Sequence, residues 1–192
     1  MTNFEARKNK GQQLQNQLIA FLSKNQIDFL YSGYERMTGS KNAGKNIKYK
    51  NDKTSLFIRH YPDISLISKQ SILIEVKNSS GIEKLCYENY ISLRNDLGLN
   101  VLLFLRNMKL CRIESLKFKK AWPTCPKTKI KIPIIDDVWL SPRLLDKDDY
   151  YKYINAYKNT SSGSTFAFID FDETEFIDLG KLLLLNQQQE TP

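Results

Sequence analysis

The chain has 192 residues, of which 41% are hydrophobic, a length and composition typical of one folded domain rather than a disordered segment. Its three cysteines fit neither a disulfide framework nor a zinc site, which favours a reducing, intracellular location, cytoplasmic or nucleoid-associated. No apolar run approaches the ~18 residues of a membrane span, and the polar N-terminal stretch lacks the apolar centre of a signal peptide, so we expect no membrane partner.

The net charge of +8 is unevenly distributed along the chain. Residues 1–135 hold 24 Lys+Arg against 10 Asp+Glu, whereas residues 136–192 hold 5 against 11. A basic body with an acidic tail suggests a polyanionic partner for the first part, although a solvated lysine-rich surface is also common.

Hydrophobic periodicity divides residues 1–120 into a helix, several strands, a second helix and further strands. In chain order we expect a helix over 4–24, strands over 27–32, 55–59, 63–67 and 71–77, a turn over 78–81, a helix over 82–97 that Gly98 ends, and strands over 100–106 and 110–118. This order predicts an α/β fold with a central mixed β-sheet flanked by helices.

Residues 121–192 are expected to form a C-terminal extension packed on the core of residues 1–120. Residues 121–135 look extended, residues 150–157 helical, and residues 166–177 like one strand or a hairpin.

Charged residues gather on two adjacent predicted strands. Asp63 begins one strand, while Glu75 and Lys77 end the next with Val76 between them. Because alternate side chains of a strand share a face, Glu75 and Lys77 point one way and Val76 the other.

The apolar pattern predicts on which side Asp63 lies. Burying the aliphatic residues of the two strands together requires Ile64 to face Ile74 or Val76, because residues directly opposite share a face. That register places Asp63 opposite one of the two charged residues of the later strand. We therefore predict an odd-numbered loop, or a bulge, between the strands, and two carboxylates and an ammonium on one side of the sheet.

Such a cluster suits phosphodiester hydrolysis. The carboxylates of Asp63 and Glu75 can hold Mg²⁺ or Mn²⁺, with the carbonyl of Val76 as a further ligand. The metal would neutralise charge on the scissile phosphate and acidify a bound water. Lys77 would orient or deprotonate that water, or stabilise the developing charge.

Pro62-Asp63, followed by Glu75-Val76-Lys77 at the end of an apolar strand, resembles the signature of the PD-(D/E)XK nuclease superfamily. The following helix and apolar strand match that family's core order, so the resemblance covers roughly residues 4–106. It implies a restriction-endonuclease-like core and a divalent-metal-dependent endodeoxyribonuclease of the restriction, homing, junction-resolving or mobile-element type. A small chain with one site would need to act as a homodimer, or to act twice, to cut both strands.

The first helix departs from the family pattern. Many family members place a glutamate there, facing the metal, whereas this chain has Gln15, whose oxygen could ligate metal or water without adding charge. Glu5 is an alternative acid on the same helix. A catalytically inactive nucleic-acid-binding protein on the same scaffold is therefore the main alternative, and a protein-interaction module with a basic face is a third.

A basic, glycine-containing segment precedes the predicted site. It could track the phosphates of double-stranded or branched DNA, or be an ordinary solvated loop. Its charged residues, the predicted DNA contacts, are Arg36, Lys41, Lys45, Lys48, Lys50 and Lys53. His60 could assist proton transfer, but a structural role is commoner, and Tyr90 is expected to pack against the sheet. The sequence shows no stacking platform for single-stranded nucleic acid.

Overall fold

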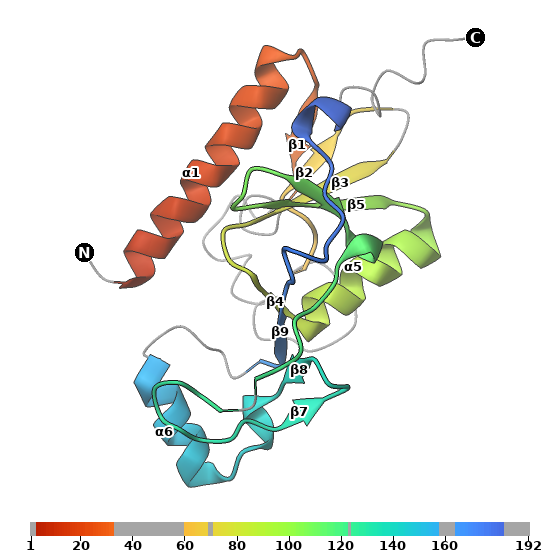
Figure 1. The fold of residues 1–192 in the computed structure, drawn as a ribbon. Coiled ribbons are helices and arrows are strands. Elements are labelled where there is room, and N and C mark those ends of the chain that lie inside the picture. Colours follow the sequence, from red (N-terminus) through yellow and green to blue (C-terminus); the bar gives the residue numbers. More distant parts are fainter. Residues whose placement is uncertain (1–2, 33–59, 69–70, 123, 158–163, 183–192) are drawn as a thin grey trace, which may run out of the picture.

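A five-stranded sheet forms the centre of the computed structural model, which describes residues 3–32, 60–68, 71–122, 124–157 and 164–182 (Figure 1). The sheet order is β1-β2-β3-β5-β6, with β1 (Phe29–Tyr31), β2 (Ile64–Leu66), β3 (Ile72–Lys77), β5 (Asn100–Leu105) and β6 (Leu110–Arg112). β3 and β5 are parallel and the other neighbours antiparallel, so the predicted mixed sheet is confirmed. The predicted strand over 55–59 lies outside the described residues.

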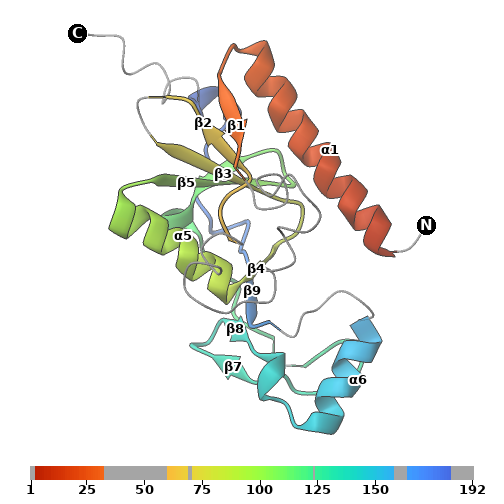
Figure 2. The same cartoon turned by 180° about the vertical axis from the view of Figure 1, so that it is seen from behind.

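Two helices cover opposite faces of this sheet (Figures 1 and 2). α1 (Asn3–Lys24) buries leucines at helical spacing, and α5 (Lys84–Leu97) buries Cys86, Tyr90 and Leu93. β5 lies between the two layers, and its residues 101–105 are all buried, which explains the continuous apolar run in its sequence. The α/β class with flanking helices is therefore as predicted.

The second helix begins later than the sequence predicted. Residues Gly81–Glu83 form a short strand, β4, which pairs with β9 (Phe166–Phe168), and α5 begins only at Lys84. Local periodicity assigned these residues to the first helical turn, but their pairing with the distant β9 makes them a strand instead. The helix ends as predicted at Gly98, whose φ of 65° is the left-handed conformation that glycine adopts readily.

A smaller sheet and a further helix make up much of the remaining described structure. The smaller sheet has the order β4-β9-β8-β7, with β7 (Ile134–Ile135) and β8 (Trp139–Leu140). η2 (Pro142–Leu144) leads to α6 (Lys147–Tyr157), which confirms the predicted helix and begins three residues earlier. Cys125, Ile132, Leu140 and Tyr153 form the buried cluster of this region.

Two predicted strands are shorter than expected. After β6 the chain turns into a 3₁₀ helix, η1 (Ile113–Ser115), so the predicted strand over 110–118 ends at Arg112. The segment 166–177 is neither one strand nor a hairpin: beyond β9, Ile169 pairs with Phe118 and Ile177 with Leu110. These contacts are made with separate parts of the chain, and only the tertiary structure reveals them.

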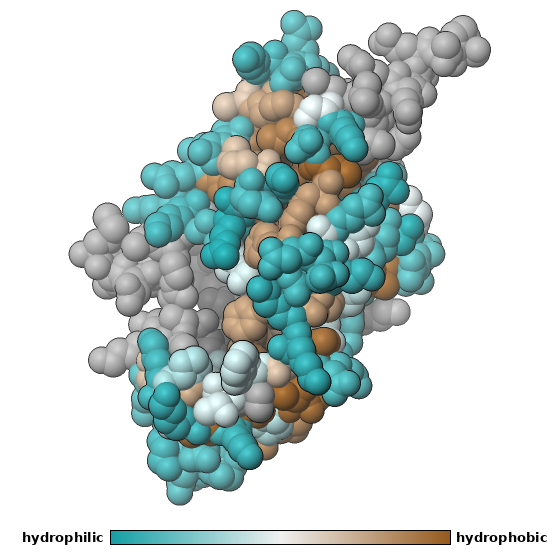
Figure 3. Space-filling model, in the orientation of Figure 1, coloured by the Kyte–Doolittle hydropathy of each residue, from teal (hydrophilic) through white to brown (hydrophobic). Residues whose placement is uncertain are grey.

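In the described residues, no helix is both long and apolar enough for a membrane span. The face drawn in Figure 3 is largely hydrophilic, with hydrophobic residues reaching the surface in patches, one of them over β7 and β8. The three cysteines are free thiols, which agrees with their not fitting a disulfide framework, and all three are buried.

Candidate active site

The pairing of β2 with β3 decides where the acidic residues lie. The two strands are antiparallel with Ile64 opposite Ile74, one of the two registers that the hydrophobic pattern allowed. Residues 67–71, an odd number, connect the strands, as predicted. One step further along the same register places Asp63 opposite Glu75, on the face away from the buried isoleucines.

A hydrogen bond fixes the carboxylate of Asp63 against β3. The backbone N–H of Val76 donates to Oδ2 of Asp63 at 2.9 Å. Val76 lies between Glu75 and Lys77, and Nζ of Lys77 is 3.4 Å from Oε1 of Glu75. The structure therefore brings the three predicted residues to one stretch of β3.

Glu75 is an acid with strongly altered protonation. Its side chain is only 14% exposed, and burial raises the pKa to about 7. Asp63 raises this pKa further, whereas the ammonium of Lys77 and a hydrogen bond from Tyr90 lower it. Without a cation, the carboxylate of Glu75 therefore takes up a proton at higher pH than an exposed glutamate does.

Lys77 remains an ammonium. Burial lowers its pKa, but the carboxylate of Glu75 raises it, both by its charge and by a hydrogen bond, and the net direction is upward. Lys77 is therefore a fixed positive charge, and the role of a general base that removes a proton from water does not suit it.

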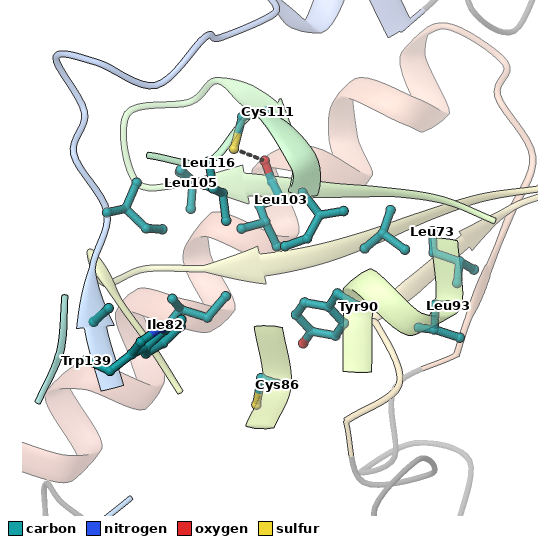
Figure 4. Packing of buried hydrophobic residues seen from close by; sticks show 14 residues of the cluster. Leu73, Ile82, Cys86, Tyr90, Leu93, Leu103, Leu105, Cys111, Leu116 and Trp139 are labelled. Carbon is teal, nitrogen blue, oxygen red and sulfur yellow. Dashed lines mark hydrogen bonds between the residues drawn. The ribbon is translucent and has the colours of Figure 1, made fainter. Parts of the chain in front are cut away.

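Tyr90 of α5 covers Glu75 from the helix side. Its side chain is 1% exposed and packs beside Leu73 and Leu93 (Figure 4). Burial raises the pKa of Tyr90 well above its ordinary value, so the phenol keeps its proton and donates a hydrogen bond to the carboxylate of Glu75. The prediction that Tyr90 packs against the sheet is confirmed, and the sequence did not reveal the hydrogen bond.

Two further side chains of α5 form hydrogen bonds with His60, in the segment that leads to Asp63. Sγ of Cys86 is 2.9 Å from Nδ1 of His60, and Nδ2 of Asn89 donates to the carbonyl of His60 at 3.1 Å. Burial raises the pKa of Cys86 to about 12, so the thiol keeps its proton, and the tautomer of His60 decides which of the two groups is the donor. These contacts support a structural role for His60, the commoner of the two that the sequence suggested.

The other end of this segment is tied to β1. Oγ of Ser32 donates to the carbonyl of Pro62 at 2.9 Å, and the backbone N–H of Ser32 donates to the carbonyl of Asp63 at 2.9 Å. Asp63 is thus held by α5, β1 and β3 together. The spacing of Cys86 and Tyr90, four residues apart on one face of a helix, was a signal that could have pointed to these contacts.

Gln15 lies in a different layer of the molecule. Its neighbours Leu14 and Leu18 on α1 pack with Ile64 and Ile74, on the sheet face opposite to Glu75. The amide oxygen of Gln15 accepts a hydrogen bond from Gln12 at 3.3 Å. The geometry of the described residues thus gives Gln15 no contact with the carboxylates, and its catalytic role remains a prediction.

The predicted DNA-contacting residues all fall between residues 33 and 59, outside the described part of the chain. They are Arg36, Lys41, Lys45, Lys48, Lys50 and Lys53.

The oxygen atoms of the site are donors of the kind that Mg²⁺ and Mn²⁺ bind. Among the described residues, no group of three or more His, Cys, Asp and Glu side chains could hold a metal ion. The site offers two carboxylates instead, and hard cations accept backbone carbonyls and waters as additional ligands.

On a strand the N–H and carbonyl of one residue point to the same edge, so the carbonyl of Val76 points toward Asp63. Pro62 falls opposite Val76 in this register and has no N–H to offer that carbonyl. These oxygens fit a hard cation that keeps several waters.

No protein-family model matches this chain, and no curated protein matches it. Among solved structures, the chain is similar to Hjc, a Holliday junction resolvase from the archaeal hyperthermophile Archaeoglobus fulgidus. The likeness has 16% sequence identity and a TM-score of 0.36, and covers 57% of this chain and 78% of that chain. What this chain does is therefore inferred from the side chains around Glu75.

Proposed function

We propose that this protein is a divalent-metal-dependent endodeoxyribonuclease that hydrolyses DNA phosphodiester bonds. The observation that carries the proposal is the hydrogen bond from the N–H of Val76 to the carboxylate of Asp63. This bond places Asp63 beside Glu75 and Lys77. These are the residues in which the sequence resembles PD-(D/E)XK nucleases. Restriction, homing, junction-resolving and mobile-element enzymes are the types that this resemblance implies.

The carboxylates of Asp63 and Glu75, with the carbonyl of Val76, would hold Mg²⁺ or Mn²⁺. When bound, the cation would neutralise charge on the scissile phosphate and acidify a water molecule. The buried tyrosine hydroxyl of Tyr90 keeps one oxygen of Glu75 in a fixed direction. A carboxylate held in this way loses less conformational freedom when it binds a cation.

Lys77 supplies positive charge next to the carboxylates. Its ammonium stabilises the negative charge that builds up on the phosphate oxygens in the transition state, and orients the attacking water. The site is only partly exposed, with Lys77 19% and Glu75 14% accessible, so this charge is weakly screened by solvent.

Protons and cations compete for Glu75. Because burial raises the pKa of this carboxylate to about 7, metal binding must displace a proton near neutral pH. Cleavage at limiting Mg²⁺ is therefore expected to rise with pH through about 7 and then to level off.

The substrate proposed is double-stranded or branched DNA, contacted by the basic segment that contains Arg36 and Lys41. Because each chain has one such site, a homodimer would place two sites for cutting both strands.

Incubation of the purified protein with supercoiled, linear and branched DNA, with and without Mg²⁺ or Mn²⁺, tests this proposal. We expect metal-dependent cleavage that Asp63→Asn abolishes while DNA binding is retained. Asp172→Asn is the matched control, because Asp172 is an exposed acid outside the site. Tight DNA binding by the wild type without cleavage under any of these conditions would instead identify an inactive nucleic-acid-binding protein.

A further inference from the structure

One of the two tryptophans lies almost fully in solvent. Trp122 is 82% exposed, whereas Trp139 is 6% exposed and packs against Tyr87 and Phe118. A tryptophan ring is the largest apolar surface that a side chain can offer, and tryptophan is strongly buried on average in folded proteins. Exposure of Trp122 therefore points to a binding surface.

Trp122 lies two residues before a two-stranded ribbon. Thr124 pairs with Lys131, and the N–H of Cys125 donates to the carbonyl of Ile130 at 2.8 Å. The buried side packs into the cluster around α6 and consists of Ala121, Cys125, Ile130 and Ile132. Exposed residues of this region, here called the basic ribbon, are Lys120, Trp122, Lys129 and Lys131.

The segment that carries this ring is rich in lysine. Residues 115–135 contain six lysines and no Asp or Glu. Of the two acids that follow this segment, Asp136 forms an ion pair with Lys84 of α5 at 3.4 Å, and the exposed Asp137 lies beside Trp122, since its carbonyl accepts a hydrogen bond from the N–H of Ala121 at 3.0 Å. Lys127, in the turn of the ribbon, is directed toward α6, since its ammonium donates to the carbonyl of Ala156 at 3.4 Å.

We propose that the basic ribbon binds single-stranded nucleic acid, with Trp122 stacked on an unpaired base and the lysines in contact with phosphates. Aromatic rings serve every base because each base has a flat face, and lysines follow the backbone without reading sequence. The inference rests on the proposed nuclease function and deepens it, because it names unpaired nucleotides as part of the substrate that the ribbon recognises.

Tryptophan fluorescence in EDTA, where no cleavage occurs, tests this inference with oligodeoxythymidine as the probe. We expect oligodeoxythymidine to quench the emission of Trp122, and Trp122→Phe to identify that signal against buried Trp139. Trp122→Ala should weaken binding about 5-fold to 100-fold, the range seen when a stacked aromatic is removed. An abasic strand with the same number of phosphates should bind more weakly and cause no quenching.

Two control sets separate stacking from charge. Replacing Lys120 and Lys131 by glutamine should lower the slope of log affinity against log salt by about 0.7 for each lysine. Tyr151→Ala is the matched control, because Tyr151 is an exposed aromatic beside acidic residues on α6, and we expect unchanged affinity.

Equal affinity for the abasic and thymidine strands, or wild-type affinity in Trp122→Ala, would overturn the inference. Dissociation of a dimer by Trp122→Ala, without loss of strand binding, would also overturn it by assigning the surface to self-association. A wild type that is quenched by oligodeoxythymidine but cuts no DNA with Mg²⁺ or Mn²⁺ would refute the proposed nuclease and leave the ribbon assignment standing.

Discussion

The two faces of β3 differ in what they bury. Toward α1, Ile72 and Ile74 pack in a cluster of apolar side chains. Toward α5, the same strand buries Glu75 and Lys77 beside Tyr90. Burying charges costs free energy even when they are paired, whereas burying isoleucine stabilises the fold. One face of this strand therefore serves stability alone, and the other gives up some stability for a reactive arrangement.

The largest effect expected on the α5 face is loss of cleavage. Glu75→Gln removes a proposed metal ligand and a negative charge while it keeps the size of the side chain. We expect cleavage to fall by at least about a hundredfold in a plasmid-nicking assay, with the circular dichroism spectrum of the folded protein retained. Wild-type cleavage by this variant would remove Glu75 from the catalytic site.

The opposite result is expected on the α1 face. Ile74→Ala leaves a cavity between the sheet and α1, and should lower the free energy of unfolding by about 2–5 kcal/mol in urea titrations. Cleavage per folded molecule should stay near that of the wild type. A loss as large as that of Glu75→Gln, measured on fully folded protein, would show that the two faces are not functionally distinct.

The cost of burying Glu75 should be visible in the pH dependence of stability. The folded-state pKa of about 7 lies above the unfolded value, so the folded protein binds more protons between these values, and stability falls as pH rises through them. Relative to Glu75→Gln, the wild type should lose on the order of 3 kcal/mol between about pH 4.5 and about pH 7 in the absence of metal. A constant difference between the two proteins across this range would contradict the assignment.

A smaller effect is expected at the contacts that hold His60. Cys86→Ala removes the hydrogen-bond partner of the imidazole and should cost about 1 kcal/mol of stability, together with part of the cleavage activity, because Asp63 is less firmly placed. Cys86→Ser, which keeps a donor, should restore much of that activity. Cys111→Ala is the control, since this thiol is buried in the same cluster and bonds to Leu103 instead. Equal loss of activity per folded molecule in both alanine variants would argue against a positioning role for Cys86.

The smallest effect is expected for Gln15. Because α1 lies on the other face of the sheet, Gln15→Ala should change cleavage by less than about threefold, far below the effect of removing a transition-state contact. A loss comparable to that of Glu75→Gln would instead place Gln15 at the metal, as the family pattern suggested.

The sequence predicted the central sheet and the convergence of Asp63 with Glu75 because both follow from burial of alternating aliphatic residues. The register that places Ile64 opposite Ile74 in the core also places Asp63 opposite Glu75 on the other face of the sheet. Local periodicity could not reveal β4, which exists through pairing with residues 166–168.

The supporting contacts were beyond sequence for a similar reason. The bonds from Cys86 and Asn89 to His60 join segments that are 26 and 29 residues apart, and nothing in either segment specifies its partner. The exposure of Trp122 depends on which side of its ribbon faces the cluster around α6. That choice is made by tertiary packing rather than by local propensity.

Binding of Mn²⁺, followed by electron paramagnetic resonance, tests most directly whether Asp63 and Glu75 together hold a cation. We expect the wild type and Asp172→Asn to bind Mn²⁺ with equal affinity, and both Asp63→Asn and Glu75→Gln to lose this binding. Undiminished Mn²⁺ binding in both site variants would contradict the proposed metal site, whatever the protein does to DNA.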